Sequence, residues 1–340
     1  MATTTNDPDV NSVISRRSVS RPVFIVGCPR SGTTLLYHML LSSGGFAVYR
    51  TETHLFNMLA PKFGDLGSRR NRQKFFEHWL KSKYFRLSGL HPEDVRDRVL
   101  HECQNWGDFL RIIMEAIACS QGVNRWAENT PEHVLHLHDI KRNVPDALIL
   151  HLIRDARDAA LSLNKQGWVR PYPWDRDDSL LVAGLYWEWL VTTGRNVGRD
   201  LGSDYMEVSY ERLVEQPAET LATIAPFIQH DLNYENIRRV AIGSVGEPNT
   251  SFASQGNSFK PLGRWKQVIP KGQLARFEAL VGDTMKECGY ELATPPDALP
   301  SALGLNAMRA LYEIGFRSRQ WMKMNTPLAR IFVNTESMYE

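Results

Sequence analysis

Cysteine is scarce in this chain, with four residues among 340, and they lie far apart in the sequence. They are Cys28, Cys103, Cys119 and Cys288, and no two of them form a Cys-x-x-Cys pair. Zinc sites and disulfide frameworks need closely spaced or paired cysteines, so the sequence argues against both. Thiols that stay reduced fit a reducing compartment, and we therefore expect a cytoplasmic protein without a metal site.

Long apolar runs and a strong charge bias are also missing. No stretch of about 18 or more apolar residues occurs, so we expect no bilayer-spanning helix. The net charge is only +2, which does not indicate a broad nucleic-acid-binding surface. Residues 1–20 are rich in Ser, Thr and Asn and lack an apolar segment, so we expect a disordered tail rather than a signal peptide or an anchor.

The most informative stretch runs from Pro22 to Met39. It begins with Val23–Val26, a β-branched and aromatic run typical of a buried parallel strand. Gly27 to Gly32 then break the strand as a turn, and from Thr33 apolar residues recur every three to four positions, which predicts a helix. Such a strand, loop and helix N-terminus form an anion site, because unpaired N–H groups and the positive end of the helix dipole converge there.

The turn has the Gly-x-x-x-x-Gly spacing of a phosphate-binding loop, but Thr33 stands where such a loop carries its lysine. Arg30 offers instead a planar fork of donors that suits phosphate or sulfate oxygens. An ordinary strand, turn and helix, with glycine present for packing, is the alternative interpretation.

A candidate base follows the next predicted strand, Phe46–Thr51. Glu52 comes directly after it, and ligands of open parallel sheets bind outside the carboxyl ends of the strands, so we expect Glu52 beside the loop. A carboxylate repels a phosphosulfate but suits the role of general base. His54 is the rival for that role, and an acid that only stabilises a helix N-terminus is the alternative for Glu52.

A second apolar run, Ala147–Ile153, predicts another buried strand that ends in Arg154. Ser162 follows eight residues after Arg154, in a predicted helix. The planar guanidinium fork of such an arginine is suited to bidentate binding of phosphate oxygens. A plain charge pattern of Arg and Asp at a helix start is the alternative.

Pro29–Thr34 (PRSGTT) resembles the 5′-phosphosulfate-binding loop of sulfotransferases that use 3′-phosphoadenosine-5′-phosphosulfate (PAPS). The resemblance is closer to the PRSGTT-type bacterial, tyrosylprotein and carbohydrate branches than to the cytosolic branch. The strand end at Arg154 is similar to the family's 3′-phosphate-binding segment. The residues to which the resemblance assigns the donor nucleotide are Arg30, Ser31, Gly32, Thr33, Thr34, Arg154 and Ser162.

The same resemblance bears on the catalytic residues. Glu52-Thr53 is similar to the tyrosylprotein branch, which implies that Glu52 is the base, whereas the cytosolic branch uses a histidine, which would here be His54. In the segment 128–131, Asn129 replaces the lysine with which relatives approach the transferring group. Either Arg30 carries the transition-state charge alone, or the chain is less active than its relatives.

Two later segments complete the resemblance. Tyr210, in the strand-like segment 204–210, resembles a tyrosine that contacts the adenine end of the nucleotide; a strand-end tyrosine that packs on the sheet is the alternative. Segment 258–266 resembles a basic loop that closes over the 3′-phosphate, with Lys260 as first choice and Arg264 as second. A surface loop with ordinary cations is the alternative there.

The resemblance implies a P-loop-like three-layer α/β domain over residues 21–292, with a central parallel sheet flanked by helices. It implies transfer of the sulfuryl group of PAPS to a hydroxyl of a small-molecule, lipid or glycan acceptor, with release of 3′-phosphoadenosine-5′-phosphate (PAP). A P-loop kinase-like phosphotransferase and a non-catalytic nucleotide-binding protein of the same fold are the alternatives. Segment 168–178 is expected to be a loop that could close over the site.

Two other features carry weaker expectations. Residues 293–340 predict a Pro-rich linker and an amphipathic helix over Leu303–Met324, which packs on its own domain, joins a homodimer or, less in keeping with the pattern, lies on a membrane surface. His133, His136 and His138 lack the spacing of a metal motif, so we expect them on a solvated or half-buried helix surface.

Overall fold

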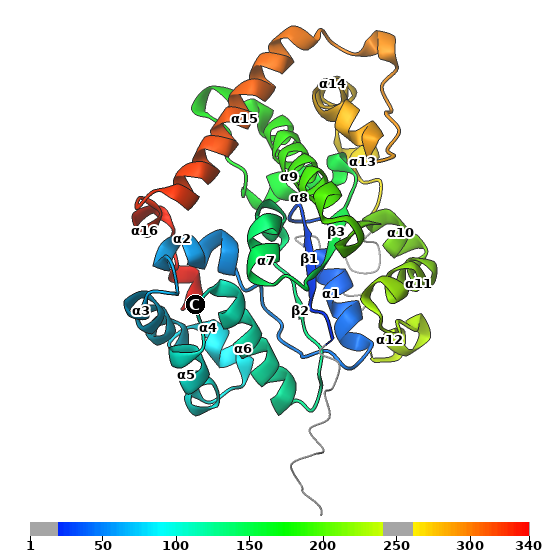
Figure 1. Ribbon diagram of the computed structural model, residues 1–340. Coiled ribbons are helices and arrows are strands. Elements are labelled where there is room, and N and C mark those ends of the chain that lie inside the picture. The colour runs from blue at the N-terminus through cyan, green and yellow to red at the C-terminus, as the bar shows by residue number, and fades with distance from the viewer. Residues whose placement is uncertain (1–19, 241–260, 340) are drawn as a thin grey trace, which may run out of the picture.

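The computed structural model describes residues 20–240 and 261–339, which form layers of helices around a sheet (Figure 1). Within these ranges lies a four-stranded parallel sheet with the order β2-β1-β3-β4. Its strands are β1 Val23–Gly27, β2 Ala127–Glu128, β3 Leu148–Ile153 and β4 Tyr205–Ser209. β1 and β3 pair over all of β1, which places Ile25 opposite Leu150. The predicted fold class is confirmed.

Side chains of the central strands alternate between two hydrophobic layers. Phe24 and Val26 pack in one layer, and Val23 and Ile25 pack in the other. The first layer is covered by α7 (Leu137–Asn143), α8 (Ala156–Gln166) and α9 (Ser179–Leu201). The second is covered by α1 (Thr33–Ser42), α11 (Pro217–Ile228) and α12 (Tyr234–Val240). Burial on both faces explains why the strands read as continuous apolar runs.

The sheet order changes direction at the carboxyl ends of β1 and β3, where a crevice is expected. These strands are neighbours, but the chain passes from β1 to β2 on one side and from β3 to β4 on the other. Ligands of open α/β sheets bind at such a change of direction. The loop before α1 and the residue Arg154 lie at these two strand ends.

Helices fill the rest of the chain. The elements after residue 54 are η2 Leu55–Leu59, α2 Ala60–Phe63, α3 Arg69–Leu80, α4 Lys83–Ser88, α5 Pro92–His101 and α6 Trp106–Ser120. The later short elements are η3 Pro131–His136, η4 Pro173–Asp178, η5 Gly202–Asp204, α10 Tyr210–Glu215, α13 Trp265–Val268, η7 Pro296–Ala298, α16 Ala329–Phe332 and η8 Glu336–Met338.

The prediction of a strand over residues 46–51 is wrong. One bridge joins Phe46 to Arg125, and the backbone of Val48 bonds instead to the side-chain amide of Gln121. Val48 N donates to Gln121 Oε1 at 2.7 Å, and Gln121 Nε2 donates to Val48 O at 3.1 Å. Because β2 has only two residues, it offers no partner long enough for a second strand here.

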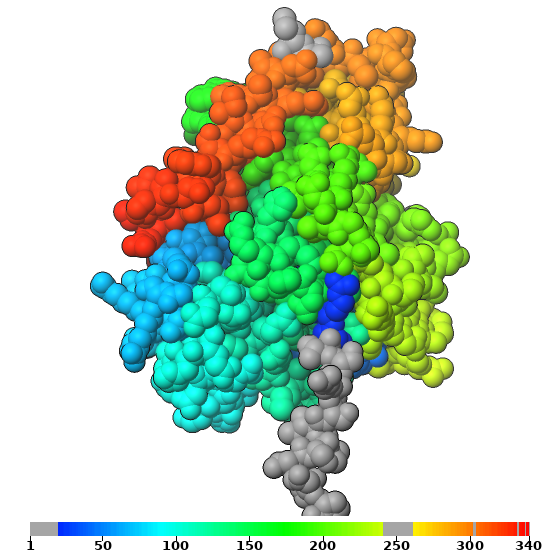
Figure 2. All heavy atoms as spheres, viewed as in Figure 1, coloured from blue at the N-terminus to red at the C-terminus, as the bar shows by residue number. Residues whose placement is uncertain are grey.

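Two long helices close the chain. They are α14 Lys271–Glu287 and α15 Ala302–Asn325, which confirms the helix predicted for the C-terminal segment. α15 packs on α9 and α14 and crosses the surface toward α2, as the orange-to-red atoms of Figure 2 show. In the described part of the chain no helix has the length and apolar character needed to cross a bilayer.

Candidate active site

The loop after β1 has a tightly constrained backbone. Arg30 (φ 73°) and Gly32 (φ 90°) both lie in the left-handed region, which an arginine rarely adopts. A Cβ atom added at Gly32 would lie less than 3.0 Å from the ring of Tyr210, so glycine is needed for space as well as for conformation. Gly32 provides no side-chain cap for α1, and the first turn of α1 carries no acid. The helix N-terminus is therefore available to an anion.

Arg30 joins the two predicted anion-binding segments. Its Nε donates to Ser162 Oγ at 3.0 Å, and its backbone O accepts from Arg154 Nη1 at 2.8 Å. Its guanidinium carbon lies 5.6 Å from the ring centroid of Trp168. The crevice expected from the strand order is thus bordered on one side by the loop and on the other by the end of β3. Trp168 belongs to the segment predicted to be a loop, and the sequence alone did not single it out.

Arg154 is held by backbone groups and by an aromatic ring. Arg154 Nη2 donates to Pro261 O at 2.6 Å, and the guanidinium carbon lies 4.5 Å from the ring centroid of Tyr210. Tyr210 is the first residue of α10 and is buried, so its ring lines the crevice between Gly32 and Arg154. Arg154 Nε is buried and has no partner among the described residues.

Of the two basic candidates on the late segment, only one can be placed. Lys260 lies outside the described residues. Arg264 precedes α13, and burial lowers its pKa, with Arg154 contributing in the same direction and Asp158 opposing. Asp158 accepts from Gly263 N at 2.7 Å, which ties this segment to α8. Arg264 therefore lies near the predicted 3′-phosphate site.

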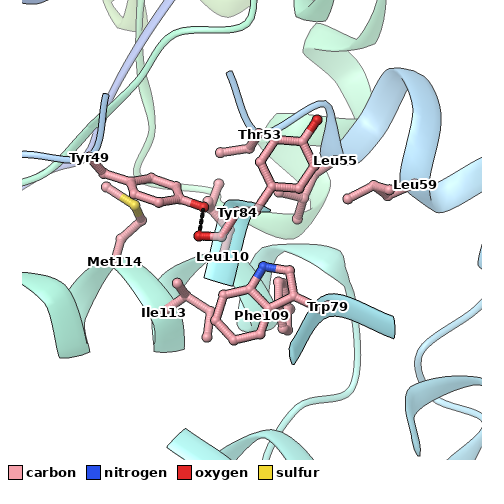
Figure 3. Close-up of a pocket in the computed structure, with 10 residues that line it drawn as sticks. All are labelled: Tyr49, Thr53, Leu55, Leu59, Trp79, Tyr84, Phe109, Leu110, Ile113 and Met114. Carbon is pink, nitrogen blue, oxygen red and sulfur yellow. Dashed lines mark hydrogen bonds between the residues drawn. The ribbon is translucent and has the colours of Figure 1, made fainter. Parts of the chain in front are cut away.

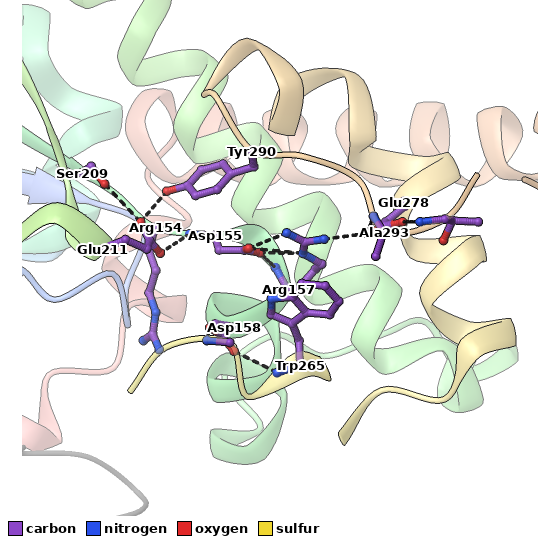
Figure 4. A network of polar contacts seen from close by, with 12 residues as sticks. Arg154, Asp155, Arg157, Asp158, Ser209, Glu211, Trp265, Glu278, Tyr290 and Ala293 are labelled. Atoms are coloured by element: carbon purple, nitrogen blue, oxygen red, sulfur yellow. Dashed lines mark hydrogen bonds and ion pairs between the residues drawn. The ribbon is translucent and has the colours of Figure 1, made fainter. Parts of the chain in front are cut away.

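A buried ion network supports the backbone around Arg154 (Figure 4). Arg157 Nη2 lies 2.6 Å from Asp155 Oδ2, Arg157 Nη1 lies 2.7 Å from Glu278 Oε1, and its guanidinium carbon is 3.7 Å from the ring centroid of Trp265. Asp155 N donates to Glu211 Oε1 at 2.9 Å. The sequence alone did not predict this network. The one local feature that points to it is a second arginine, Arg157, three residues after Arg154.

The two rivals for the role of base form one pair. Glu52 Oε2 lies 3.3 Å from His54 Nε2. Burial raises the pKa of Glu52, Glu128 and Glu132 raise it further and Arg30 opposes them, which leaves it at about 7. Burial lowers the pKa of His54. His54 also has a left-handed backbone (φ 50°), so strain collects at both the loop and the base.

A buried carboxylate holds this pair in place. Glu128 accepts from Thr53 Oγ1 at 2.7 Å, from Thr130 Oγ1 at 2.5 Å and from His133 Nδ1 at 2.9 Å. Thr130 Oγ1 in turn accepts from His54 N at 3.2 Å. Burial alone would raise the pKa of Glu128, but His133 and the two hydroxyls lower it to about 2. The carboxylate is therefore charged and fixes the backbone on which the candidate base stands.

The histidine cluster differs from its prediction. His133 and His136 are buried rather than solvated, because His133 donates to Glu128 and His136 Nδ1 lies 3.2 Å from Asp139 Oδ2. His138 is exposed. Within the described ranges no group of three or more His, Cys, Asp or Glu side chains could hold a metal ion.

Asn129 comes directly after β2, next in the chain to Glu128. Its Oδ1 is buried and has no hydrogen-bond partner among the residues that the structure describes. The next residue, Thr130, comes directly before Pro131, and its hydroxyl bonds to Glu128 and does not cap η3.

A small apolar cavity adjoins the base (Figure 3). Thr53 lines it, next in the chain to Glu52, and its other walls come from η2, α3, α4 and α6. Tyr49 OH donates to Tyr84 O at 3.0 Å across this space. The lining residues are Tyr49, Thr53, Leu55, Leu59, Trp79, Tyr84, Phe109, Leu110, Ile113 and Met114.

Known proteins share this sequence pattern and fold. A family described as "Sulfotransferase family" matches residues 22–234. The structure is similar to the sulfotransferase domain of the Synechococcus PCC 7002 olefin synthase, with 19% identity, a TM-score of 0.54 and coverage of 80% of this chain and 96% of that one.

Two further likenesses are more distant. Sulfotransferase STF9 from Mycobacterium avium has 14% identity and a TM-score of 0.42, with 82% of this chain and 79% of that one covered. Retinol dehydratase in complex with androsterone and inactive cofactor PAP has 15% identity and a TM-score of 0.38, with 81% and 83% covered. No curated protein sequence matches the chain. Because the family match spans more than half of the chain, the protein belongs to the sulfotransferase family and is an enzyme that transfers sulfate.

Proposed function

We propose that the protein transfers the sulfuryl group of PAPS to a hydroxyl group of an acceptor and releases PAP. The observation that carries this proposal is the junction at Arg30, which donates to Ser162 and accepts from Arg154. PAPS has a phosphosulfate at its 5′ end and a phosphate at its 3′ position. A crevice with one anion-binding segment on each side suits a ligand with two anionic ends.

Buried polar atoms support a ligand in this crevice. Ser31 Oγ and Arg154 Nε are buried without hydrogen-bond partners in the described ranges, and buried polar groups are normally paired. In our scheme the residues that hold the 5′-phosphosulfate are Arg30, Ser31, Gly32, Thr33 and Thr34. Those assigned to the 3′-phosphate and the adenine are Arg154, Ser162, Arg264, Lys260 and Tyr210.

Glu52 is the proposed base. It takes the hydroxyl proton while the acceptor oxygen bonds to sulfur and the bond from sulfur to the 5′-phosphate oxygen of PAP breaks. A pKa of about 7 suits proton transfer near neutral pH, and His54 at 3.3 Å orients the carboxylate. Arg30 and the loop N–H groups stabilise the charge that grows on the leaving oxygen; such donors contribute about 3–4 kcal/mol each.

The acceptor is a hydroxyl-bearing small molecule, lipid or glycan. The apolar cavity beside Thr53 has room for about one water molecule and does not bear on the choice of acceptor. We also place the reaction in a reducing compartment such as the cytoplasm. All four cysteines lie within the described residues and are free thiols, which supports this location.

Two measurements test the proposal. Isothermal titration should show PAP binding that is far tighter than binding of ATP with Mg²⁺; the reverse order would favour a kinase-like phosphotransferase. Mass spectrometry should then detect a sulfated product after incubation with PAPS and an extract of the source cells. PAP binding without sulfation of any acceptor would favour a non-catalytic nucleotide-binding protein, an outcome that Asn129 in place of a lysine makes worth testing.

A further inference from the structure

The C-terminal helix α15 is fastened to the segment that faces the nucleotide crevice. Tyr312 OH accepts from Tyr172 N at 2.8 Å and donates to Asp175 Oδ2 at 3.0 Å. Tyr172 and Asp175 belong to the same stretch as Trp168, whose ring lies over Arg30. The first half of α15 therefore holds the loop that borders the anion site.

The second half of α15 reaches the other side of the site. Gln320 Nε2 lies 3.0 Å from His136 Nε2, at the end of η3. Phe316, Gln320 and Lys323 lie at helical spacing on one face of α15. The ring centroid of Phe316 is 5.5 Å from that of Tyr186, whose hydroxyl donates to Glu132, so this face of α15 is turned toward Glu132. Lys323 is half-buried. The lysine contributes to the lowered pKa of Glu132, and the carboxylate in turn opposes the lowering of the Lys323 pKa by burial.

Beyond α15 the chain is tied down again. Lys62 Nζ donates to Arg330 O at 2.7 Å and to Val333 O at 2.9 Å, and His78 Nδ1 lies 2.7 Å from Tyr339 OH. These contacts join the C-terminal segment to α2 and to α3, and α3 also lines the apolar cavity. Lys323 is therefore held in place from both ends of its helix.

Glu132 begins a chain of polar contacts that ends at the proposed base. It accepts from Tyr186 OH at 2.5 Å and from Asn57 Nδ2 at 2.9 Å. Asn57 Nδ2 also lies 3.4 Å from His54 Nδ1, and His54 Nε2 lies 3.3 Å from Glu52. Since an amide nitrogen only donates, His54 Nδ1 is the acceptor, and the imidazole proton lies on Nε2, toward Glu52.

We propose that Lys323 is a positioning residue of the active site, whose positive charge offsets that of Glu132 and, through the contacts of Glu132 with Asn57, sets the orientation and charge balance of the His54–Glu52 pair. This inference rests on the proposed role of Glu52. α15 is then part of the catalytic machinery, and not only a helix that packs against the domain.

The sign of the electrostatic effect follows from the groups around the pair. Glu52 is faced by Arg30 from the loop, Glu128 from β2 and Glu132 from η3. The negative charge of Glu132 contributes upward to the pKa values of both Glu52 and His54. Removal of the lysine leaves that charge without its counterion, so both groups should bind protons at higher pH than in the unaltered protein.

The first experiment does not depend on turnover. The His54 imidazole is titrated by ¹⁵N NMR, with its signal assigned by its loss in His54→Gln. Lys323→Met should move the titration to higher pH, and Lys323→Arg should restore it. Arg317→Met is the matched control, because this arginine of α15 is exposed and pairs with Glu313, and it should leave the titration unchanged.

The second experiment measures kcat/KM against pH with PAPS. Lys323→Met should lose about threefold on the acid limb, the effect of half a pKa unit, with little loss at high pH. An unshifted His54 titration in a folded Lys323→Met protein would overturn the inference. If that variant does not fold, Glu132→Gln must move the titration to lower pH, and no movement overturns it. Absence of sulfation in the unaltered protein would count against the proposed function alone, since the NMR result stands independently.

Discussion

Substitution of Gly32 by alanine tests whether the loop and Tyr210 form one nucleotide site. The residue has φ 90°, and the added Cβ would lie under 3.0 Å from the Tyr210 ring, whereas ordinary contacts are 3.4–4 Å. The left-handed backbone costs an alanine about 1–2 kcal/mol. The ring must also move away from Arg154, whose guanidinium carbon lies 4.5 Å from the ring centroid, and such a contact contributes about 1 kcal/mol.

The assay is the dissociation constant of PAP by isothermal titration. Gly32→Ala should weaken PAP about 10- to 100-fold, because the loop, the ring and Arg154 shift together. Gly44→Ala is the matched control, since Gly44 has φ 81° and nothing within 4 Å of an added Cβ. It should lose about 1–2 kcal/mol of unfolding free energy in urea without any change in PAP affinity.

A double-mutant cycle separates the clash from the backbone effect. On a Tyr210→Ala background, Gly32→Ala should cost less affinity than in the unaltered protein, because the ring that the Cβ strikes is gone. Unaltered PAP affinity in Gly32→Ala would refute the reasoning. Equal losses on both backgrounds would show that Tyr210 does not contact the nucleotide site through Gly32.

Three further predictions concern charged residues. Glu52→Ala should abolish turnover and leave the affinity for PAP near normal. In the unaltered enzyme, kcat/KM should rise as the pH passes through about 7, where Glu52 loses its proton. A pH profile that stays flat would contradict this assignment. Arg154→Ala should weaken PAP by roughly 2–3 kcal/mol, measured by titration against Arg142→Ala on the exposed side of α7, and equal affinities would remove Arg154 from the site. Glu128→Gln should lower the free energy of unfolding by about 3 kcal/mol at neutral pH, because the pKa of the carboxylate falls from 4.5 to about 2 on folding. This contribution to stability is present above pH 4.5 and is lost toward pH 2. Urea melts of the variant and the unaltered protein should therefore converge as the pH falls.

Local patterns in the sequence were enough to predict the segments to which we assign anion binding. β1, its glycine-bounded loop, β3 and the arginine at its end are each encoded in a few consecutive residues, because buried parallel strands and tight turns need particular residue types. Their order along the chain also predicted that the strand ends would meet, and the bonds of Arg30 to Ser162 and Arg154 show that they do.

The catalytic half depends on contacts between residues that are remote in the sequence. Thr53 donates a hydrogen bond to Glu128, and Asn57 donates one to Glu132, in each case to a residue 75 positions later in the sequence. These contacts fix the segment on which the two candidate bases, Glu52 and His54, lie as a pair. The strand expected before Glu52 is absent, since the segment forms one bridge, from Phe46 to Arg125, and the side chain of Gln121 bonds to the backbone of Val48. No local pattern reports such partners.

The sequence by itself determined the fold class, the two strand ends that we propose as anion-binding segments and the helical nature of the C-terminal segment. Tertiary structure alone decided which face of α15 meets η3 and brought Lys323 to Glu132, more than 180 residues away in the chain, as Gln320 and His136 are at 184. The periodicity of a helix shows which of its faces is apolar. It does not show what a charged side chain such as Lys323 does, because that depends on the residues that tertiary packing places near it.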